Sequence, residues 1–459
     1  MTFEGQAVWS TIQDRANIKL AIAFIIVFTG FIFAVDAYYT SLPYYNSYIS
    51  DEIWYVDSAR NIMLKLGIQP RTSGPMATVF IDKQFDLNII ANQILSIQGV
   101  ESVKKIEKAW AIYVRASSWN AFSEIEKLQG VIEIKPGYEY GDAENINNYY
   151  NMEHPPLGKY ILMFSMASIG DNPAGWRIPG MISGGVLCIA VGLIVREATR
   201  RDIYAVLASV LAASDPLIRN MAGVAMLDIY LSLFTTLSIY AATRNSWILS
   251  GVFLGLAIST KMSGVFAALP LIVISIINGR SITGIYRDLI LIPGAVFMVL
   301  NLPIIQLFGL QAWYDQSIVG AISWHLRTKT APGEGPPISA PWMWLYGDNP
   351  FYLTVSPDTV ARGNIYVYLG SIALSAALLP AARFFQCMSM LTVSTYMTWL
   401  GYVILWILGN HSQYSFYMVQ LSPLFSALFM TQLWAVFENI DIIIPSYSFL
   451  YRRRKTADR

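Results

Sequence analysis

The sequence predicts an α-helical polytopic membrane protein with about ten transmembrane helices and a small α+β insertion in its first outer loop. Of the 459 residues, 55% are hydrophobic and only 13% are charged, and the mean hydropathy is +0.45. Apolar stretches of roughly 17 to 25 residues, the length that crosses a ~30 Å hydrocarbon core, recur along the chain. This balance excludes an ordinary soluble globular protein.

The first apolar stretch, residues 18-37, has no small-residue cleavage site after it, so we expect it to stay as an uncleaved span. Basic side chains such as Lys19, Arg196 and Arg244 flank the spans on one side, which the positive-inside rule makes cytoplasmic. Both termini are therefore expected inside. The expected spans are 19-37, 178-195, 203-214, 224-242, 246-260, 264-278, 289-308, 364-382, 388-408 and 414-436.

Two large segments, residues 38-177 and 309-363, then lie outside, and we look for function there. The net charge is only +1, and the basic residues lie between the apolar stretches without forming one stripe. Both features argue against a nucleic-acid partner. The chain has only two cysteines, Cys188 inside an expected span and Cys387 directly before one, so the sequence predicts neither a disulfide framework nor a cysteine metal site. No cofactor is identified, and no motif indicates a metal cage.

We expect three parts in the chain. Residues 1-69 contain the first span and the start of the outer loop, residues 70-145 form an outer insertion, and residues 146-459 form the membrane core with the outer loop 309-363. The order of elements in the insertion is β-α-β-β-α-β, which predicts a ferredoxin-like sandwich with two helices on one face of an antiparallel sheet. We expect a spacer or docking role. Its strands are expected at 77-81, 100-107, 111-116 and 131-136, and its helices at 86-97, capped by Asp86, and 117-129.

Two adjacent carboxylates, Asp51 and Glu52, follow the first span next to aromatic residues. Such a pair suits acid or base chemistry. The alternative is a solvated pair at a helix start, where acidic side chains complement the helix dipole. Asp57 and Arg60 continue the stretch, so we expect a short amphipathic helix that lies on the membrane and turns the pair toward a crevice.

Several cations follow in the same outer segment. His154 and Lys159 stand at the first turn of a helix that should start near Leu157, after two prolines, where a phosphate can bind. Arg177 lies at the outer mouth of the second span, where a guanidinium either pairs with a phosphate in bidentate fashion or anchors to lipid headgroups.

Asp228 and Lys261 interrupt apolar stretches, and a charge at membrane depth marks a candidate site because it is costly there. For Lys261 the alternative is snorkelling from a short hairpin. Trp342 in the outer loop 309-363 and His411 at the last outer turn are candidate sugar or acceptor contacts, although tryptophans also form headgroup belts.

Taken together, these motifs resemble the protein O-mannosyltransferase family, within the class C membrane glycosyltransferases that use lipid-phosphate sugars. The resemblance covers most of the chain outside residues 70 to 145. The motifs, in order, are the Asp-Glu pair, HPPLGK at 154-159, GWRIP at 175-179, MLD at 226-228, STKMSG at 259-264 and SAPWMW at 339-344.

The resemblance implies transfer of a hexose, with mannose as the family default, from a polyprenyl-phosphate lipid to a hydroxyl acceptor. Protein Ser or Thr is the first choice of acceptor, and a lipid or glycan hydroxyl is the second. Asp51 would be the base that takes the acceptor proton, with Glu52 orienting the sugar or the acceptor beside it. Direct attack would invert the anomeric carbon. Arg177 and Lys261, helped by Lys159 and His154, would bind the donor phosphate.

The chain departs from the family pattern in four places, one of which is that the aromatic loop lacks a second His. It lacks the β-trefoil domain of the larger eukaryotic members, which suggests a prokaryotic cell-membrane protein. Gly223 stands where an arginine is expected, and only Arg219, one turn earlier, could compensate. The insertion 70-145 is foreign to the family, and we expect it to govern which acceptor approaches.

Two other functions compete with this interpretation. A flippase or transporter of lipid-linked sugars would also need buried charge and interfacial aromatics, but no pair of broken hydrophobic segments in matching halves indicates an inverted repeat. A polytopic scaffold would have no use for HPPLGK or the Asp-Glu pair.

Overall fold

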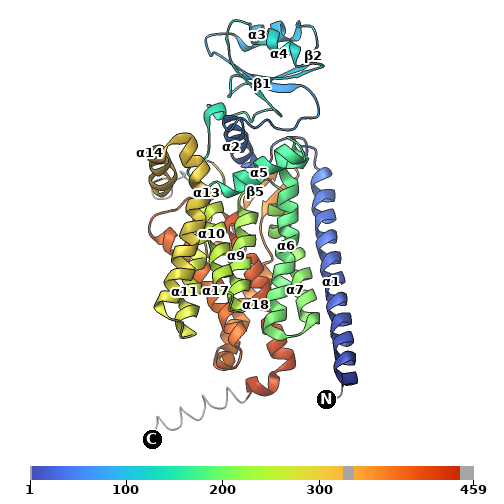
Figure 1. The fold of residues 1–459 in the computed structure, drawn as a ribbon, viewed down its shortest axis with the longest axis vertical. Coiled ribbons are helices and arrows are strands. Elements are labelled where there is room, and N and C mark those ends of the chain that lie inside the picture. The colour runs from blue at the N-terminus through green and yellow to red at the C-terminus, as the bar shows by residue number, and fades with distance from the viewer. Residues whose placement is uncertain (1–2, 324–334, 445–459) are drawn as a thin grey trace.

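In the computed structural model, a helical bundle carries a small α+β unit at one end (Figure 1). The structure describes residues 3–323 and 335–444, with side chains from residue 17 onward. The long helices run side by side, and α1 lies along one flank against α6 and α7. The bundle consists of α1 (Phe3–Thr40), α6 (Pro173–Thr199), α7 (Asp202–Ala213), α8 (Pro216–Ala222), α9 (Asp228–Thr243), α10 (Trp247–Thr260), α11 (Ala268–Ile277), α12 (Ile282–Tyr286), α13 (Ile292–Phe308), α16 (Ile365–Leu378), α17 (Gln386–Ile407) and α18 (Ser422–Glu438).

Every expected span overlaps a helix, and the chain is a polytopic membrane protein. Five helices in the described part are long and apolar enough to cross a membrane, and the apolar helices Asp202–Ala213, Trp247–Thr260 and Met262–Ile277 are shorter, with 10–17 residues each. The number ten therefore stays a prediction. The five are Asn17–Thr40, Pro173–Thr199, Ile282–Phe308, Ile365–Phe384 and Gln386–Ile407.

The segment 309-363, expected to be an outer loop, begins as helix. α14 (Leu310–Trp313) and the π-helical η4 (Tyr314–Gly320) extend α13 after a break at Gly309, whose φ of 86° suits glycine. A 3-10 turn, η5 (Met343–Leu345), and a hairpin of β5 (Phe351–Val355) and β6 (Asp358–Ala361) follow. Residues 324–334 of this segment lie outside the described residues.

The insertion has the element order expected from its sequence. Its strands are β1 (Met76–Ile81), β2 (Val100–Ile106), β3 (Ala111–Ala116) and β4 (Val131–Pro136), joined in the antiparallel order β2-β3-β1-β4. The helices α3 (Leu87–Leu95) and α4 (Asn120–Ile125) cover one face with a closed apolar core. Asp86 caps α3 as expected, whereas α4 is shorter than expected and has no side-chain cap.

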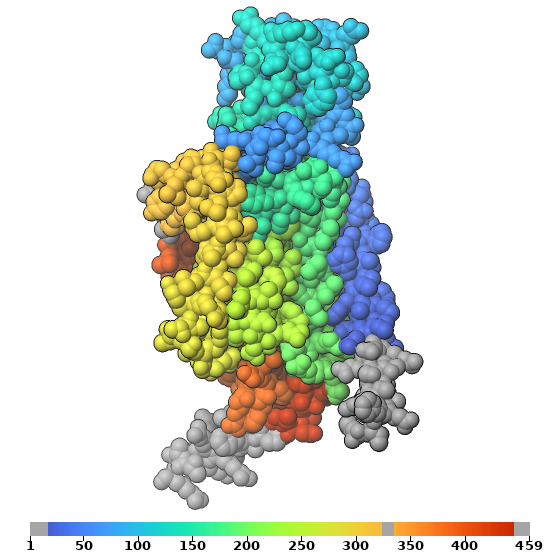
Figure 2. Space-filling model, viewed as in Figure 1, coloured from blue at the N-terminus to red at the C-terminus, as the bar shows by residue number. Residues whose placement is uncertain are grey.

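The other face of this sheet packs against residues 140–149 and Ile53 of α2 (Glu52–Lys65), which lies beneath the insertion (Figures 1 and 2). The expected amphipathic surface helix is therefore wrong, because every residue of α2 from Tyr55 to Met63 is buried. Arg60 pairs there with Asp57 and, in bidentate fashion, with Asp171. The polar residues that suggested exposure instead satisfy one another between the insertion and the bundle.

Asn61 joins three parts of the chain at this contact. Its Nδ2 donates to the carbonyl oxygens of Ile146 and Tyr149, each at 2.8 Å, and its Oδ1 accepts from Lys135 Nζ and the Tyr140 hydroxyl, each at 2.9 Å. All four hydrogen bonds of this buried amide are used. The insertion is thus fixed to α2 and to residues 146–149, which follow the insertion in the chain and include η1 (Ile146–Asn148).

Candidate functional site

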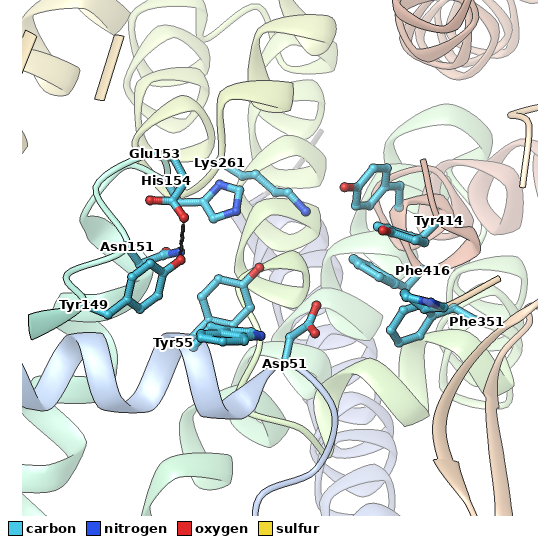
Figure 3. Close-up of a pocket in the computed structure, with 13 residues that line it drawn as sticks. Asp51, Tyr55, Tyr149, Asn151, Glu153, His154, Lys261, Phe351, Tyr414 and Phe416 are labelled. Carbon is cyan, nitrogen blue, oxygen red and sulfur yellow. Dashed lines mark hydrogen bonds between the residues drawn. The ribbon is translucent and has the colours of Figure 1, made fainter. Parts of the chain in front are cut away.

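A cavity of about 390 Å³ lies between α2, the segment 149–154 and the ends of the bundle helices nearest the insertion (Figure 3). Polar groups occupy one wall, and aromatic rings from the β5 and η7 (Ser415–Gln420) region occupy the opposite wall. It is lined by Asp51, Trp54, Tyr55, Tyr149, Asn151, Glu153, His154, Lys261, Pro336, Phe351, Tyr414, Phe416 and Tyr417.

Asp51 is the residue just before α2, and its side chain points into this cavity (Figure 3). Its carboxyl accepts no hydrogen bond from the amide groups of the α2 start, so the side chain does not act as a helix cap. Burial raises the pKa of Asp51 from 3.8 to about 6; the charge of Lys261 opposes this rise and that of Asp228 adds to it. A carboxylate with a pKa near 6 is ionised at neutral pH and basic enough to accept a proton.

Lys261 and Asp228 form a buried ion pair at the cavity, with 2.8 Å between Nζ and Oδ1. The ammonium also lies 4.1 Å from the centre of the Tyr417 ring. Lys261 follows the end of α10 in extended backbone, and Asp228 opens α9, so two helix ends place the pair. Asp228 Oδ2 has no hydrogen-bond partner in the described structure.

A second cavity of about 190 Å³ begins at the same lysine and is almost entirely apolar. Lys261 and Tyr417 line both cavities, so they stand at the junction of a polar space and an apolar one. The second cavity is lined by Lys261, Met262, Ser263, Val265, Phe266, Ala321, Ile322, Tyr402, Leu405, Asn410 and Tyr417.

Glu52 and Arg177 are paired with each other outside the cavity. Arg177 donates from Nε and Nη2 to the two carboxylate oxygens of Glu52, at 2.8 and 2.7 Å, and both side chains are fully buried. Glu52 also accepts from the backbone amides of Ile49 and Ala225, and Arg177 donates to the carbonyl oxygen of Tyr45. This clamp ties the start of α2 to α6, next to Asp51.

Lys159 is likewise buried outside the cavity. It stands in the first turn of α5 (Leu157–Ser168) and donates to the carbonyl oxygens of Asn151 and, at 2.8 Å, His154. Burial lowers the pKa of Lys159 to about 7. Its contacts brace the segment that carries His154, which does line the cavity with its ring 5.8 Å from that of Tyr55.

Trp342 and His411 lie near each other but do not line the cavity. Each packs against Trp406, with ring centres 5.8 and 4.9 Å apart. At Gly223 the expected arginine has no room, because a Cβ there would clash with the Tyr39 ring. The structure therefore brings Asp51, His154, Asp228 and Lys261 together and leaves the other expected side chains around them.

The rest of the cavity lining had little signal in the sequence. Tyr149 donates to Glu153, and Asn151 donates to both, so these three side chains form one wall. Glu153 directly precedes HPPLGK, and its place next to this motif is the one feature of the sequence that could have indicated it as a cavity residue. Phe351 comes from β5, far from Asp51 along the chain, so no local pattern indicates that both residues line one cavity. Among the described residues, no group of His, Cys, Asp and Glu side chains is arranged to hold a metal ion.

Comparison with known proteins supports the family resemblance. Residues 153–305 match the family model of dolichyl-phosphate-mannose-protein mannosyltransferase. A polyprenol-phosphate-mannose–protein mannosyltransferase of Corynebacterium glutamicum is 24% identical over 326 residues, which are 55% of this chain and 59% of that protein. The protein of the same name from Mycobacterium tuberculosis is 31% identical over 157 residues, 28% of this chain and 30% of that one.

The chain thus spans about three fifths of the length of the Corynebacterium relative. Among solved structures, ArnT from Cupriavidus metallidurans bound to undecaprenyl phosphate is 16% identical, with a TM-score of 0.43 over 61% of this chain and 50% of that one. The Archaeoglobus fulgidus oligosaccharyltransferase is 14% identical, with a TM-score of 0.36 over 60% and 41%. The matched segment 153–305 includes HPPLGK, GWRIP, MLD and STKMSG, and over these residues the chain is similar to the dolichyl-phosphate-mannose-protein mannosyltransferase family.

Proposed function

We propose that this protein is an inverting glycosyltransferase that moves a hexose from a polyprenyl-phosphate lipid to a hydroxyl group on the outer face of the membrane. Mannose is the proposed sugar and a protein Ser or Thr the proposed acceptor, in keeping with the names of the relatives. The observation that carries the proposal is the junction of a polar cavity with an apolar one at Lys261 and Tyr417.

The donor has the two-part chemistry of that junction. Its polyprenyl chain belongs in the apolar cavity, and its phosphate belongs beside the Lys261 ammonium. The sugar then lies in the polar cavity, where Tyr417 and Phe416 offer ring faces. A fixed cation at the phosphate lowers the barrier because negative charge develops on the leaving group as the glycosidic bond breaks.

Asp51 is the proposed base. An acceptor hydroxyl attacks the anomeric carbon as its proton passes to the Asp51 carboxylate, and the bond from that carbon to the phosphate oxygen breaks. The lipid phosphate leaves with the electron pair of that bond. Attack on the side opposite the leaving group inverts the anomeric centre, so no covalent sugar intermediate is needed.

The remaining candidates receive roles that suit their contacts. Glu52 and Arg177 position Asp51, because their buried pair holds the start of α2. Lys159 positions His154, which we place near the phosphate with Lys261. Asp228 holds the Lys261 ammonium in place. Trp342 and His411 are proposed as acceptor contacts at the rim, outside the cavity lining.

We further propose a class C fold with ten spans, cytoplasmic termini and a ferredoxin-like insertion that influences acceptor approach. The Asn61 contacts support the last point, because Tyr149, whose carbonyl binds Asn61, also lines the cavity. A movement of the insertion would therefore move one cavity wall.

The test is transfer of radiolabelled mannose from polyprenyl-phosphate-mannose to a Ser/Thr peptide in membranes that contain the wild type, Asp51→Asn or Asp36→Asn. Asp36 is an exposed residue of α1 outside the cavity lining, so its variant is the matched control. Loss of a general base typically lowers the rate about 10² to 10⁴-fold. We expect this loss only for Asp51→Asn.

Wild-type transfer that survives in Asp51→Asn would remove Asp51 from the mechanism. If the folded wild type moves the labelled lipid across the bilayer without releasing polyprenyl phosphate, the enzyme proposal is refuted in favour of a flippase.

A further inference from the structure

A third cavity, of about 360 Å³, lies at the end of the bundle away from the insertion. It is lined by Leu193, Arg196, Glu197, Arg200, Asp202, Tyr240 and Arg244. These residues come from the end of α6, the start of α7 and the end of α9. Arg177 and Arg196 are nineteen positions apart on α6, about 28 Å at 1.5 Å per residue, so this cavity is remote from the proposed reaction site.

Its depth matches the membrane boundary. Arg196 Nη2 donates to Asn17 Oδ1 at 3.0 Å, which joins the end of the candidate span Pro173–Thr199 to the start of the candidate span Asn17–Thr40. Phospholipid headgroups lie at the level where such spans begin and end. The cavity is therefore a polar hollow at headgroup depth.

The charges in the cavity are unbalanced. Arg196 pairs with Asp202 at 2.9 Å and Arg200 pairs with Glu197 at 2.6 Å. Arg244 has no carboxylate within ion-pair distance among the described side chains, and its Nη1 donates to the Tyr240 hydroxyl at 3.3 Å. Three guanidinium groups thus face two carboxylates, and one positive charge is unmatched.

The backbone supports a role for the arginine side chains beyond helix capping. Arg200 ends α6 with φ 57°, a left-handed conformation that glycine or asparagine adopts more readily. Arginine at a helix end does complement the helix dipole, and this accounts for one such residue at a time. It does not account for three arginines from two helix ends that line one hollow.

Apolar side chains are exposed on both chain segments that continue from the cavity. On α7, Ile203, Leu207 and Val210 are 46% to 60% exposed and share one helix face. On α10, Ile248 and Leu249 are 55% and 48% exposed, directly after Arg244 and the turn that follows it. Acyl chains can lie against these faces while a headgroup occupies the hollow.

We propose that this cavity binds the phosphate of an anionic phospholipid, with Arg244 as its principal ligand and Arg196 and Arg200 beside it. Basic pockets between membrane helices hold such headgroups because a guanidinium binds phosphate oxygens in bidentate fashion. The site is independent of the proposed reaction, so loss of sugar transfer and loss of lipid binding are separate outcomes.

The test is native mass spectrometry of the full-length protein after delipidation and incubation with phosphatidylglycerol, phosphatidylcholine or inorganic phosphate. Arg244→Gln is the test variant. Arg201→Gln is the control, because Arg201 is a neighbouring exposed arginine that pairs with Glu438 and does not line the cavity. Size-exclusion profiles establish that both variants are folded.

We expect the wild type and Arg201→Gln to retain phosphatidylglycerol over phosphatidylcholine, and Arg244→Gln to retain it at least about tenfold less, as loss of one charged hydrogen bond to phosphate predicts. Equal retention by all three proteins would overturn the proposal. Retention of inorganic phosphate equal to that of phosphatidylglycerol would overturn the lipid assignment and make the cavity a site for a soluble anion.

Discussion

Replacing Asp51 with asparagine should abolish sugar transfer and, at neutral pH, make the folded protein more stable. Burial raises the pKa of the Asp51 carboxyl from 3.8 to about 6, so the fold disfavours its charged form. One pKa unit corresponds to about 1.36 kcal/mol. The shift of about two units gives an upper limit of about 3 kcal/mol, which solvent in the cavity reduces.

The pH dependence of this effect follows from the sign of the shift. Above pH 6 the carboxylate is charged in both the folded and the unfolded protein, and its burial lowers the free energy of unfolding by the full amount. As the pH falls from 6 toward 3.8, the folded protein takes up the proton first and the penalty disappears. The amide side chain of the Asp51→Asn variant carries no charge at any pH, so the stability gain of the variant should fade over this interval.

The assay is thermal unfolding of the wild type, Asp51→Asn and Asp36→Asn in one detergent at about pH 7.5 and about pH 4.5, on either side of the folded-state pKa, beside the transfer assay. We expect a higher Tm for Asp51→Asn at the higher pH, a smaller difference at the lower pH, and no change for the control. A lower Tm for Asp51→Asn at the higher pH would refute the reasoning, because it would mean that the carboxylate makes a stabilising contact.

Three further predictions follow from the same site. Glu52→Gln should destabilise the protein by about 3–5 kcal/mol, because it leaves the Arg177 charge buried without a partner, and transfer should fall in proportion to the folded fraction measured by size exclusion. Transfer by the wild type should fall about tenfold per pH unit below pH 6 as Asp51 takes up its proton; a flat rate from about pH 5 to 8 would argue against this base. Lys261→Met should lower both Tm and donor affinity, and adding Asp228→Asn should restore Tm but not donor affinity. Recovery of both Tm and donor affinity in the double variant would reduce Lys261 to a structural role.

The sequence predicted the helices of this chain better than their membrane crossings. Apolar stretches located each expected span, since burial in lipid or protein selects the same residues. Length was harder to predict, because α9 and α18 contain only 16 and 17 residues and are packed inside the bundle. The elements of the insertion could be predicted because alternating strands and the Asp86 cap are local signals. The burial of α2 could not be predicted, because its polar side chains find their hydrogen-bond partners far along the chain, as Arg60 does at Asp171.

The candidate site was predictable in its charges but not in their pairing. Asp51, Asp228 and Lys261 stand out because ionisable groups in apolar surroundings are rare. That Arg177 binds Glu52 depends on how the first turns of α6 and α2 meet in the folded chain, which no local pattern encodes. The aromatic wall was hidden for a similar reason, since Phe351 and Phe416 come from separate segments that meet only in the folded chain.

The saturated amide of Asn61 limits how freely the insertion can be exchanged between proteins. A graft that replaces residues 76–136 removes Lys135, one of the two donors to Asn61 Oδ1. The incoming unit must then present an ammonium or another donor at the same point of its last strand, or a buried carbonyl oxygen loses one of its partners. The insertion is therefore not a self-contained module: its sequence can vary at the helices that face away from the membrane, while the strand that meets α2 must change together with the helix beneath it.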